Sequence, residues 1–213
     1  NMNLLYWCPY LSKVATVQAV LNSATSVKQY SKNNLNPQIL NSVGEWNEQE
    51  ENIKSKGIEL INLINSRTFY PNLPRNSYIK SRISYLLIGI VSIYKLYKFI
   101  KSKNEDDIFI IHLISAIPLI LSILFNFKCK FVLRISGYPK LNIFRSFLWK
   151  ISNKKLSAIM CPTLDTHNYL VDNKIFDKKK CFVLNDPVLE VSKFNNLRNE
   201  KIDKNIFTKK YIL

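Results

Sequence analysis

Acidic residues are scarce in this chain of 213 residues, which has 15 Asp and Glu against 31 Lys and Arg and a formal net charge of +16. An AT-rich codon bias would enrich Lys, Asn and Ile, but Asp and Glu have equally permissive codons. Codon bias alone therefore does not explain the imbalance. The charge predicts an anionic partner, which could be nucleic acid, a phosphate-bearing substrate or an anionic membrane surface.

Metal ligands are also few, because the chain has only two His and four Cys. The cysteines at positions 8, 129, 161 and 181 show no paired spacing of the kind that binds zinc. A structural metal is therefore not expected. Most of these cysteines fall at or beside predicted strands, which favours buried free thiols in a reducing cytosol. The first residues contain no basic segment followed by an apolar segment and a cleavage site, so secretion is not expected.

The long apolar run Ile108 to Phe127 has about the 20 residues needed to cross a bilayer, but it divides internally. Residues 108–113 are rich in β-branched side chains and predict a strand that closes at His112. Ser115 can cap the helix that follows, and Pro118 falls in its first turn, where a missing N–H costs little. A second strand over 130–135 then ends at 136–139. The sequence predicts strand, helix, strand, and no membrane span here.

This unit predicts a parallel sheet, since a helix that joins two buried strands gives a parallel crossover. The same alternation continues along the chain, with no internal repeat. The other expected strands cover 2–8, 38–43, 58–64, 158–161 and 181–184, and the other helices 13–30, 47–56, 77–102, 142–152 and 163–173. The predicted fold class is α/β, a Rossmann-like three-layer domain with a mostly parallel sheet. Ligands of such sheets bind outside the carboxyl ends of the strands.

The helix over 77–102 has an apolar centre at residues 85–94 that is too short to span a bilayer, and both of its flanks carry cations. This pattern suits a helix that lies against an anionic membrane surface. The alternative is a core helix that packs against the sheet with solvated ends, and the two readings are compatible on different faces. The residues predicted to face the membrane are Lys80, Arg82, Lys95, Lys98 and Lys101.

In their order, several segments resemble the N-terminal half of a family 4 glycosyltransferase with the GT-B fold. The resemblance covers most of residues 2–187. It rests on the first strand and turn, the strand that ends in His112, the segment LRISGYP at 133–139, LWK at 148–150, IMCPT at 159–163 and VLNDP at 183–187. Each segment is weak evidence alone, whereas their order and spacing are moderately specific.

The resemblance implies a two-domain, metal-independent, retaining enzyme that uses a nucleotide sugar as co-substrate. Residues 1–190 would form the Rossmann-like acceptor-binding domain. Residues 191–213 would form the interdomain linker and the start of a missing C-terminal donor-binding domain. A chain limited to these 213 residues would then be inactive on its own.

Three site predictions follow from matching positions to the family. His112 would lie beside the transferring sugar, or else be a buried core imidazole. Ser136, Gly137 and Tyr138 would form the turn that lets backbone approach a ligand, or else an ordinary turn. Arg134 would bind a phosphate bidentately, or else pair within the fold.

The first loop departs from the family pattern because Pro9 to Lys13 contains no glycine. Family members often have glycines there, which let backbone N–H groups at the helix start meet the donor phosphates. In this chain only the side chains of Ser12 and Lys13 could make such a contact. We keep both as predicted substrate-binding residues.

The leading functional hypothesis is transfer of a sugar from a nucleotide-sugar donor to a lipid-linked or polysaccharide acceptor in bacterial cell-envelope biosynthesis. The enzyme would be cytoplasmic and peripheral on the inner face of the cytoplasmic membrane. The alternative is a non-catalytic or half-enzyme module that docks at the membrane and recruits a catalytic partner. Nucleic-acid binding is not expected, because the lysines are dispersed and no nucleic-acid motif occurs.

Overall fold

The computed structural model describes residues 2–31, 35–65, 68–187, 194–196 and 198. Strands and helices alternate through this part of the chain, as the sequence predicts. The strands are β1 (Asn3–Trp7), β2 (Asn36–Asn41), β3 (Glu59–Asn62), β4 (Ile108–Ile111), β5 (Lys130–Arg134), β6 (Leu156–Cys161) and β7 (Cys181–Val183). The helices are α1 (Ala15–Tyr30), α2 (Glu50–Ser55), α3 (Tyr78–Lys101), α4 (Ala116–Leu124), α5 (Ile143–Ser152) and α6 (Leu164–Asp172), with short 3₁₀ turns η1 (Asn47–Gln49) and η2 (Lys178–Lys180).

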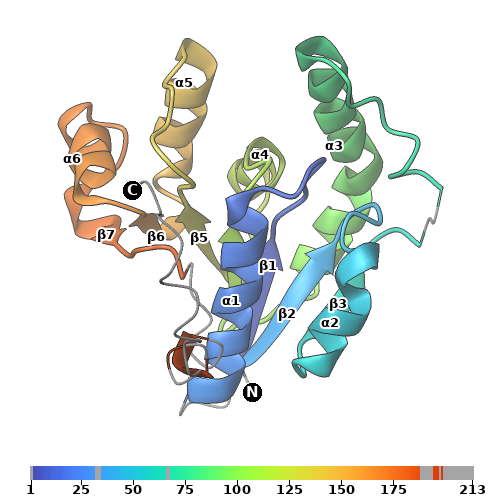
Figure 1. Cartoon of the computed structure of the whole chain (residues 1–213). Helices are drawn as coiled ribbons and strands as arrows, with labels where there is room; N and C mark the ends of the chain where they lie inside the picture. Colours follow the sequence, from blue (N-terminus) through green and yellow to red (C-terminus); the bar gives the residue numbers. More distant parts are fainter. Residues whose placement is uncertain (1, 32–34, 66–67, 188–193, 197, 199–213) are drawn as a thin grey trace, which may run out of the picture.

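The seven strands form one sheet in the order β3-β2-β1-β4-β5-β6-β7. Every neighbouring pair is parallel, so all seven carboxyl ends lie at one edge. The chain builds outward from β1 in one direction and then returns to build from β4 in the other. The switch in strand order therefore falls between β1 and β4, which lie side by side in the middle of the sheet (Figure 1).

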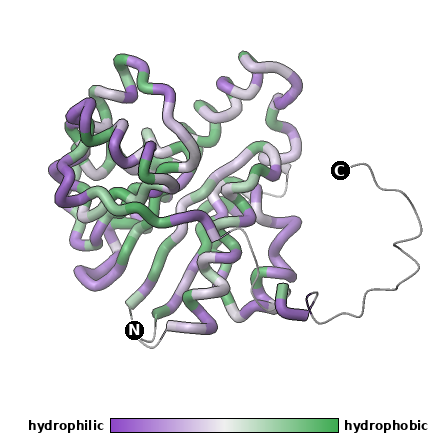
Figure 2. Tube along the Cα trace, turned by 60° about the vertical axis from the view of Figure 1, so that its left-hand side comes forward, coloured by the Kyte–Doolittle hydropathy of each residue, from purple (hydrophilic) through white to green (hydrophobic). Residues whose placement is uncertain are grey.

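Helices cover both faces of the sheet. On one face, β1 and β2 pack against α1 and α2 through a cluster that includes Tyr6, Val20, Ile39 and Ile53. On the other face, the larger cluster joins the strands to α3, α4, α5 and α6. Figure 2 shows the hydrophobic stretches running through the middle of the molecule, with hydrophilic residues along its outer turns. The predicted three-layer arrangement is confirmed.

The apolar run from Ile108 to Phe127 is divided between β4 and α4, which confirms that it is not a spanning helix. The predicted cap of α4 is confirmed in position only. Ser115 occupies the N-cap position, but its backbone is already helical and its side chain makes no capping hydrogen bond. The preceding residue, Ile114, has a φ of 49°, which is unfavourable for a β-branched side chain. The chain enters α4 through a strained turn.

The predicted start of α6 is confirmed, since Thr163 accepts a hydrogen bond from the backbone N–H of Thr166. Helix α5 begins at an equivalent cap, Asn142. Its buried residues are Leu148, Trp149 and Ser152. Helical periodicity would put Phe144, Phe147 and Ile151 on one apolar side with Leu148, but these three side chains are exposed.

All four cysteines are buried and free, as expected. The predicted domain end at residue 190 and the predicted linker over 191–213 fall almost entirely outside the described residues, so both stay predictions.

Two leucines on α3 provide a matched test of how this helix packs on the sheet. Leu96 is fully buried in the core of the sheet, whereas Leu86 on the same helix is 63% exposed. We expect Leu96→Ala to lower the free energy of unfolding by about 2–5 kcal/mol, and Leu86→Ala to change it by less than about 0.5 kcal/mol. Urea denaturation of the two variants measures both values. Equal losses would show that α3 does not pack on the sheet through Leu96.

Candidate functional site

The carboxyl edge of the sheet brings together the loops that follow β1, β2, β4 and β5. At its centre, Trp7 at the end of β1 pairs with Ile111 at the end of β4. His112 continues this pairing, since its backbone N–H donates to the Trp7 carbonyl over 2.9 Å. His112 therefore lies at the switch in strand order, where a sheet of this type opens a crevice for ligands.

The imidazole of His112 has no hydrogen-bond partner among the described residues, although both ring nitrogens are inaccessible to solvent. Its ring stacks on Tyr6 with centroids 6.0 Å apart. Burial and, to a lesser degree, the positive charge of Arg134 lower the pKa of His112 to about 3. At neutral pH the ring is uncharged, so it presents one donor and one acceptor. The alternative of a buried core imidazole is confirmed as to burial, whereas neither ring nitrogen has a hydrogen-bond partner among the described residues.

Arg134 lies at the end of β5, one strand away from His112, and it is almost fully buried. One guanidinium nitrogen, Nη2, donates to Asp186 Oδ1 over 2.6 Å. The other, Nη1, is buried without a partner in the described part of the chain. The ion pair within the fold is thus confirmed, and one donor is left over. An anion could still meet that donor, so phosphate binding stays a prediction.

The segment after β5 forms a turn that carries three predicted residues. Gly137 has a φ of 74°, a conformation that L side chains rarely adopt, and no atom lies within 4 Å of the place a Cβ would occupy. The backbone conformation, and not a crowded approach, explains this glycine. Ser136 is half-buried, and the exposed ring of Tyr138 leans on Tyr169 at 4.8 Å between centroids. Ligand contacts by these residues remain predictions.

Ser12 and Lys13 lie in the loop before α1, which begins at Ala15 and not at residue 13 as expected. Both side chains are exposed. The Nζ atom of Lys13 forms an ion pair with Glu48 Oε2 over 3.1 Å. Exposed pairs of this kind add little stability and are easily exchanged. The structure therefore leaves Lys13 able to contact a ligand without showing that it does.

The turn after β2 is a part of the site that the sequence did not reveal. Glu45 is 2% exposed, and its two carboxylate oxygens accept from the backbone N–H groups of Ser42 and Val43, each over 2.8 Å. Burial raises the pKa of Glu45 to about 7, although these hydrogen bonds oppose the rise. Glu45 is thus a buried carboxylate that caps the turn after β2.

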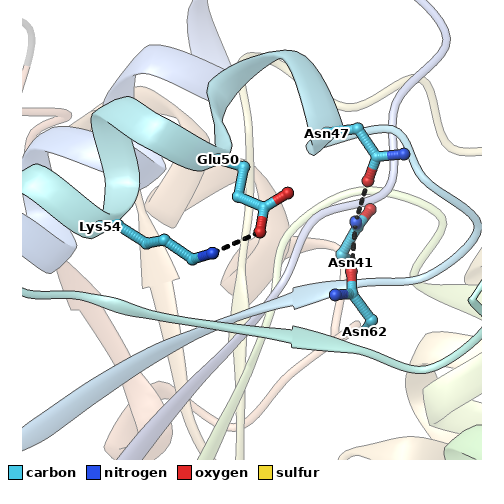
Figure 3. Close-up of polar contacts among 5 residues, drawn as sticks. All are labelled: Asn41, Asn47, Glu50, Lys54 and Asn62. Atoms are coloured by element: carbon cyan, nitrogen blue, oxygen red, sulfur yellow. Dashed lines mark hydrogen bonds and ion pairs between the residues drawn. The ribbon is translucent and has the colours of Figure 1, made fainter.

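Asn41 fixes the same turn from the end of β2. Its Oδ1 accepts from the backbone N–H groups of Gly44 and Trp46, each over 3.1 Å. Its Nδ2 donates to Asn47 Oδ1 over 2.7 Å and to Asn62 Oδ1 over 2.6 Å, beside the ion pair that joins Lys54 to Glu50 within α2 (Figure 3). Every polar atom of this amide is used, which makes the turn rigid.

Three side-chain atoms beside this turn are buried without a partner among the described residues: Tyr10 Oη, Ser42 Oγ and Trp46 Nε1. The Tyr10 ring meets Trp46 edge-on at 5.1 Å and Tyr70 at 6.3 Å between centroids. Tyr70 belongs to the segment after β3, which packs over this end of the sheet. Unpaired buried polar atoms are costly, so their accumulation at the carboxyl edge marks this region as the candidate site. No group of three His, Cys, Asp or Glu suited to a metal occurs in the described residues.

No protein-family model matches the chain, and no curated protein matches its sequence. Solved structures do share its fold. UDP-GlcNAc 2-epimerase from Neisseria meningitidis, bound to UDP-GlcNAc, matches with a TM-score of 0.56 at 10% identity, over 97% of this chain and 52% of the epimerase. A glycosyltransferase from Rickettsia africae matches with a TM-score of 0.53 at 16% identity, over 92% of this chain and 48% of the other.

UGT89C1 of Arabidopsis thaliana, complexed with UDP-L-rhamnose, matches with a TM-score of 0.55 at 8% identity, over 95% of this chain and 56% of its own. The chain thus spans about half the length of the structures it matches. These similarities show the fold. The predicted fold class, a Rossmann-like three-layer α/β domain of the kind that forms half of a GT-B protein, is confirmed.

The low pKa of His112 has a measurable consequence for stability. Between pH 6.5 and about 3 the unfolded chain binds a proton at this ring that the folded chain does not, so stability is lost as the pH falls. We expect wild type to lose about 2 kcal/mol more unfolding free energy than His112→Asn between pH 7 and pH 5. Urea titrations at the two pH values measure the difference. Parallel losses would contradict the unpaired, uncharged state of His112.

Glu45 predicts the opposite trend. Its folded-state pKa is about 7 against an ordinary value of 4.5, so the folded chain retains a proton there that the unfolded chain releases. Its contribution to stability is full below the ordinary value and is lost as the pH rises through 7. We expect wild type to lose about 2 to 3 kcal/mol more than Glu45→Gln between pH 5 and pH 8. If both proteins follow the same curve from pH 5 to 8 by chemical denaturation, Glu45 is charged throughout.

Proposed function

We propose that this chain is the N-terminal, acceptor-binding half of a retaining family 4 glycosyltransferase. Such an enzyme transfers a sugar from a nucleotide-sugar donor to a membrane-associated acceptor. The observation that carries the proposal is His112, an uncharged imidazole at the strand-order switch whose nitrogens have no hydrogen-bond partner in the described part of the chain. Structures that share this fold hold UDP-sugars, which supports a nucleotide sugar as the donor.

The proposed chemistry depends on positioning and on electrostatic stabilisation. The imidazole of His112 would hydrogen-bond the transferring sugar, and the unpaired Nη1 of Arg134 would offer a positively charged donor to the departing diphosphate. Asp186 would hold the guanidinium in place for this task. Neither role needs a metal, so we propose a metal-independent reaction. The second half of the enzyme would supply the groups that bind the nucleotide.

The acceptor and the location belong to the same proposal. The cations on α3 support a lipid-linked or polysaccharide acceptor at an anionic membrane, since Lys80, Arg82, Lys95, Lys98 and Lys101 are all exposed. The enzyme would be bacterial, peripheral on the inner face of the cytoplasmic membrane, and part of cell-envelope polysaccharide biosynthesis. Residues 1–190 would bind the acceptor, and 191–213 would lead into the donor-binding domain.

A second candidate is a half-enzyme that docks at the membrane and recruits a partner with the donor site. The exposed cations on α3 favour docking at an anionic membrane in this case as well. The sequence of the reading frame past Leu213 separates the two proposals. A second Rossmann-like domain supports the glycosyltransferase, and a stop codon supports the half-enzyme.

Activity is tested on the longest chain that the reading frame encodes, with UDP- and TDP-sugars as donors. We expect His112→Ala to lower kcat by about 100-fold or more, with little change in KM for the donor, because the contact forms with the reacting sugar. His167→Ala, at the only other histidine, serves as the control and should retain activity. NMR of the product's anomeric proton reports retention or inversion.

Two results would contradict this proposal. Full activity of His112→Ala would remove the residue from the reaction. Transfer by residues 1–213 alone, with no partner, would show that the donor site lies within this chain. Circular dichroism of the variant separates a lost contact from a lost fold.

A further inference from the structure

Two helices leave large apolar side chains in solvent near the points where they begin. On α3 the exposed residues in this part include Tyr78, Ile79, Leu86 and Ile90. On the other side of the helix, Ile88, Leu96 and Ile100 are fully buried. Helix α3 is long and apolar enough to cross a membrane by length and composition, with 33% of its most apolar window buried. Crossing would strip its buried residues from the sheet, so the helix can meet a membrane only with its outer part.

Helix α5 repeats the arrangement. Ile143 is 92% exposed, Phe144 63% and Phe147 64%, whereas Leu148 and Trp149 in its second half are buried in the core. Aromatic side chains as exposed as these present apolar surface to water, which is unfavourable unless another surface covers them. We call Tyr78, Ile79, Leu86 and Ile90 the α3 tip, and Ile143, Phe144 and Phe147 the α5 tip.

The topology puts both tips at the same edge of the sheet. In a parallel sheet, a helix that follows a strand begins at the carboxyl edge and runs back toward the amino edge. Both α3 and α5 follow strands in this way, and both pack on the same face as part of one core cluster. Figure 1 shows the two helices rising on either side of α4 above the strand ends. The tips therefore flank the candidate site.

The two segments that carry the tips have charge of one sign. No Asp or Glu occurs between Glu59 and Glu105, or between Asp107 and Asp165. The three acids at 105–107 lie at the opposite edge, because Asp107 accepts hydrogen bonds from the backbone and side-chain nitrogens of Asn3 at the start of β1. Positive charge beside exposed apolar side chains complements an anionic surface that also has an apolar interior.

Basic side chains accompany each tip. Arg82 donates to Tyr78 Oη over 2.8 Å on α3, and Arg145 donates to the Lys140 carbonyl over 2.7 Å at the start of α5. A nucleic acid would contact the cations but leave the apolar tips uncovered. A protein partner could cover the apolar tips, but it would not explain why these segments lack carboxylates. Headgroups for the cations and acyl chains for the apolar residues are both found in a lipid bilayer.

We propose that the α3 tip and the α5 tip insert together into an anionic lipid surface, with the carboxyl edge of the sheet facing the bilayer. Two separated contacts fix the orientation, which a single helix would not. The site then opens toward the membrane, where an acceptor attached to a lipid would present its glycan. This last step rests on the proposed function, whereas the contact itself does not.

Vesicle binding tests the contact with no substrate present. Vesicles of phosphatidylcholine alone are compared with vesicles that also contain phosphatidylglycerol, and bound protein is measured by flotation. We expect binding only to the anionic vesicles, and a loss of about 10-fold or more for Phe144→Ser/Phe147→Ser and for Leu86→Ser. Leu124→Ser is the matched control, since Leu124 is 67% exposed but ends α4 at the opposite edge. It should bind as wild type does.

Orientation is tested with a fluorophore on a single introduced cysteine, which is practical because the four native cysteines are buried. Labels at Ile79→Cys and Phe144→Cys should be quenched by brominated acyl chains, and a label at Leu124→Cys should not. Quenching at Ile79→Cys alone would overturn the two-tip contact. Quenching at Leu124→Cys would overturn the orientation.

Other occupants of the tips give distinct results. If the longer chain shields the label at Phe144→Cys from a soluble quencher without lipid, the second half of the protein covers the α5 tip and the proposal fails. Displacement by an oligonucleotide with unchanged affinity of the tip variants would mean a nucleic-acid surface. Transfer to a soluble acceptor analogue needs no membrane, so its loss would count against the proposed enzyme and not against the lipid contact.

Discussion

The parallel pairing of β1 with β4 is the constraint on which the rest of the structure depends. Strand β1 is buried on both faces, so Tyr6 faces the layer of α1 and Trp7 the layer of α3 to α6. The chain can build to one side of β1 and return to build on the other only if a long connection crosses the sheet. Helix α3 is that connection, and its 24 residues make it longer than the strands it crosses. The same crossing creates the crevice at His112 and carries the start of α3 beyond the sheet.

Some polar groups at the carboxyl edge have all their hydrogen bonds made, and others have no partner among the described residues. At the turn after β2, the Asn41 amide and the Glu45 carboxylate use their hydrogen-bonding atoms on backbone and side-chain partners. Close by, the hydroxyl of Tyr10 and both nitrogens of His112 are buried with none in the described residues. The turn held by Asn41 and Glu45 is therefore rigid. It lies beside donors and acceptors, on Tyr10 and His112, that are free to bind a ligand. That combination suits binding of hydroxyl-rich or anionic ligands.

Much of the fold could be predicted from the sequence because its strands are continuous apolar runs and its helices have clear starts. Asn142 and Thr163 are N-caps whose residue type already indicates the role. His112 and Arg134 could be placed at strand ends for the same reason, although the distance between the two side chains could not be predicted. The burial of Glu45 could not be predicted, since a carboxylate in a Gly-Glu-Trp turn has the same sequence whether the turn is covered or solvated. The segment around Tyr70 and Leu73 that packs over this end of the sheet reads as a loop in sequence.

The exposed side of α5 shows a different limit. Phe144, Phe147 and Leu148 belong to one apolar stripe by periodicity, and periodicity does not say whether a stripe meets the core or another surface. Only the packing shows that Leu148 and Trp149 fill the core and that the phenylalanines do not.

The imidazole of His112 is neutral because it is buried beside a positive charge. Burial and, to a lesser degree, the neighbouring guanidinium of Arg134 disfavour a proton on His112, and Asp186 forms an ion pair with that guanidinium. An anion bound at Nη1 of Arg134 would oppose this effect, since a negative charge beside the ring raises the pKa of His112. Binding of an anion there and protonation of His112 would therefore be linked thermodynamically.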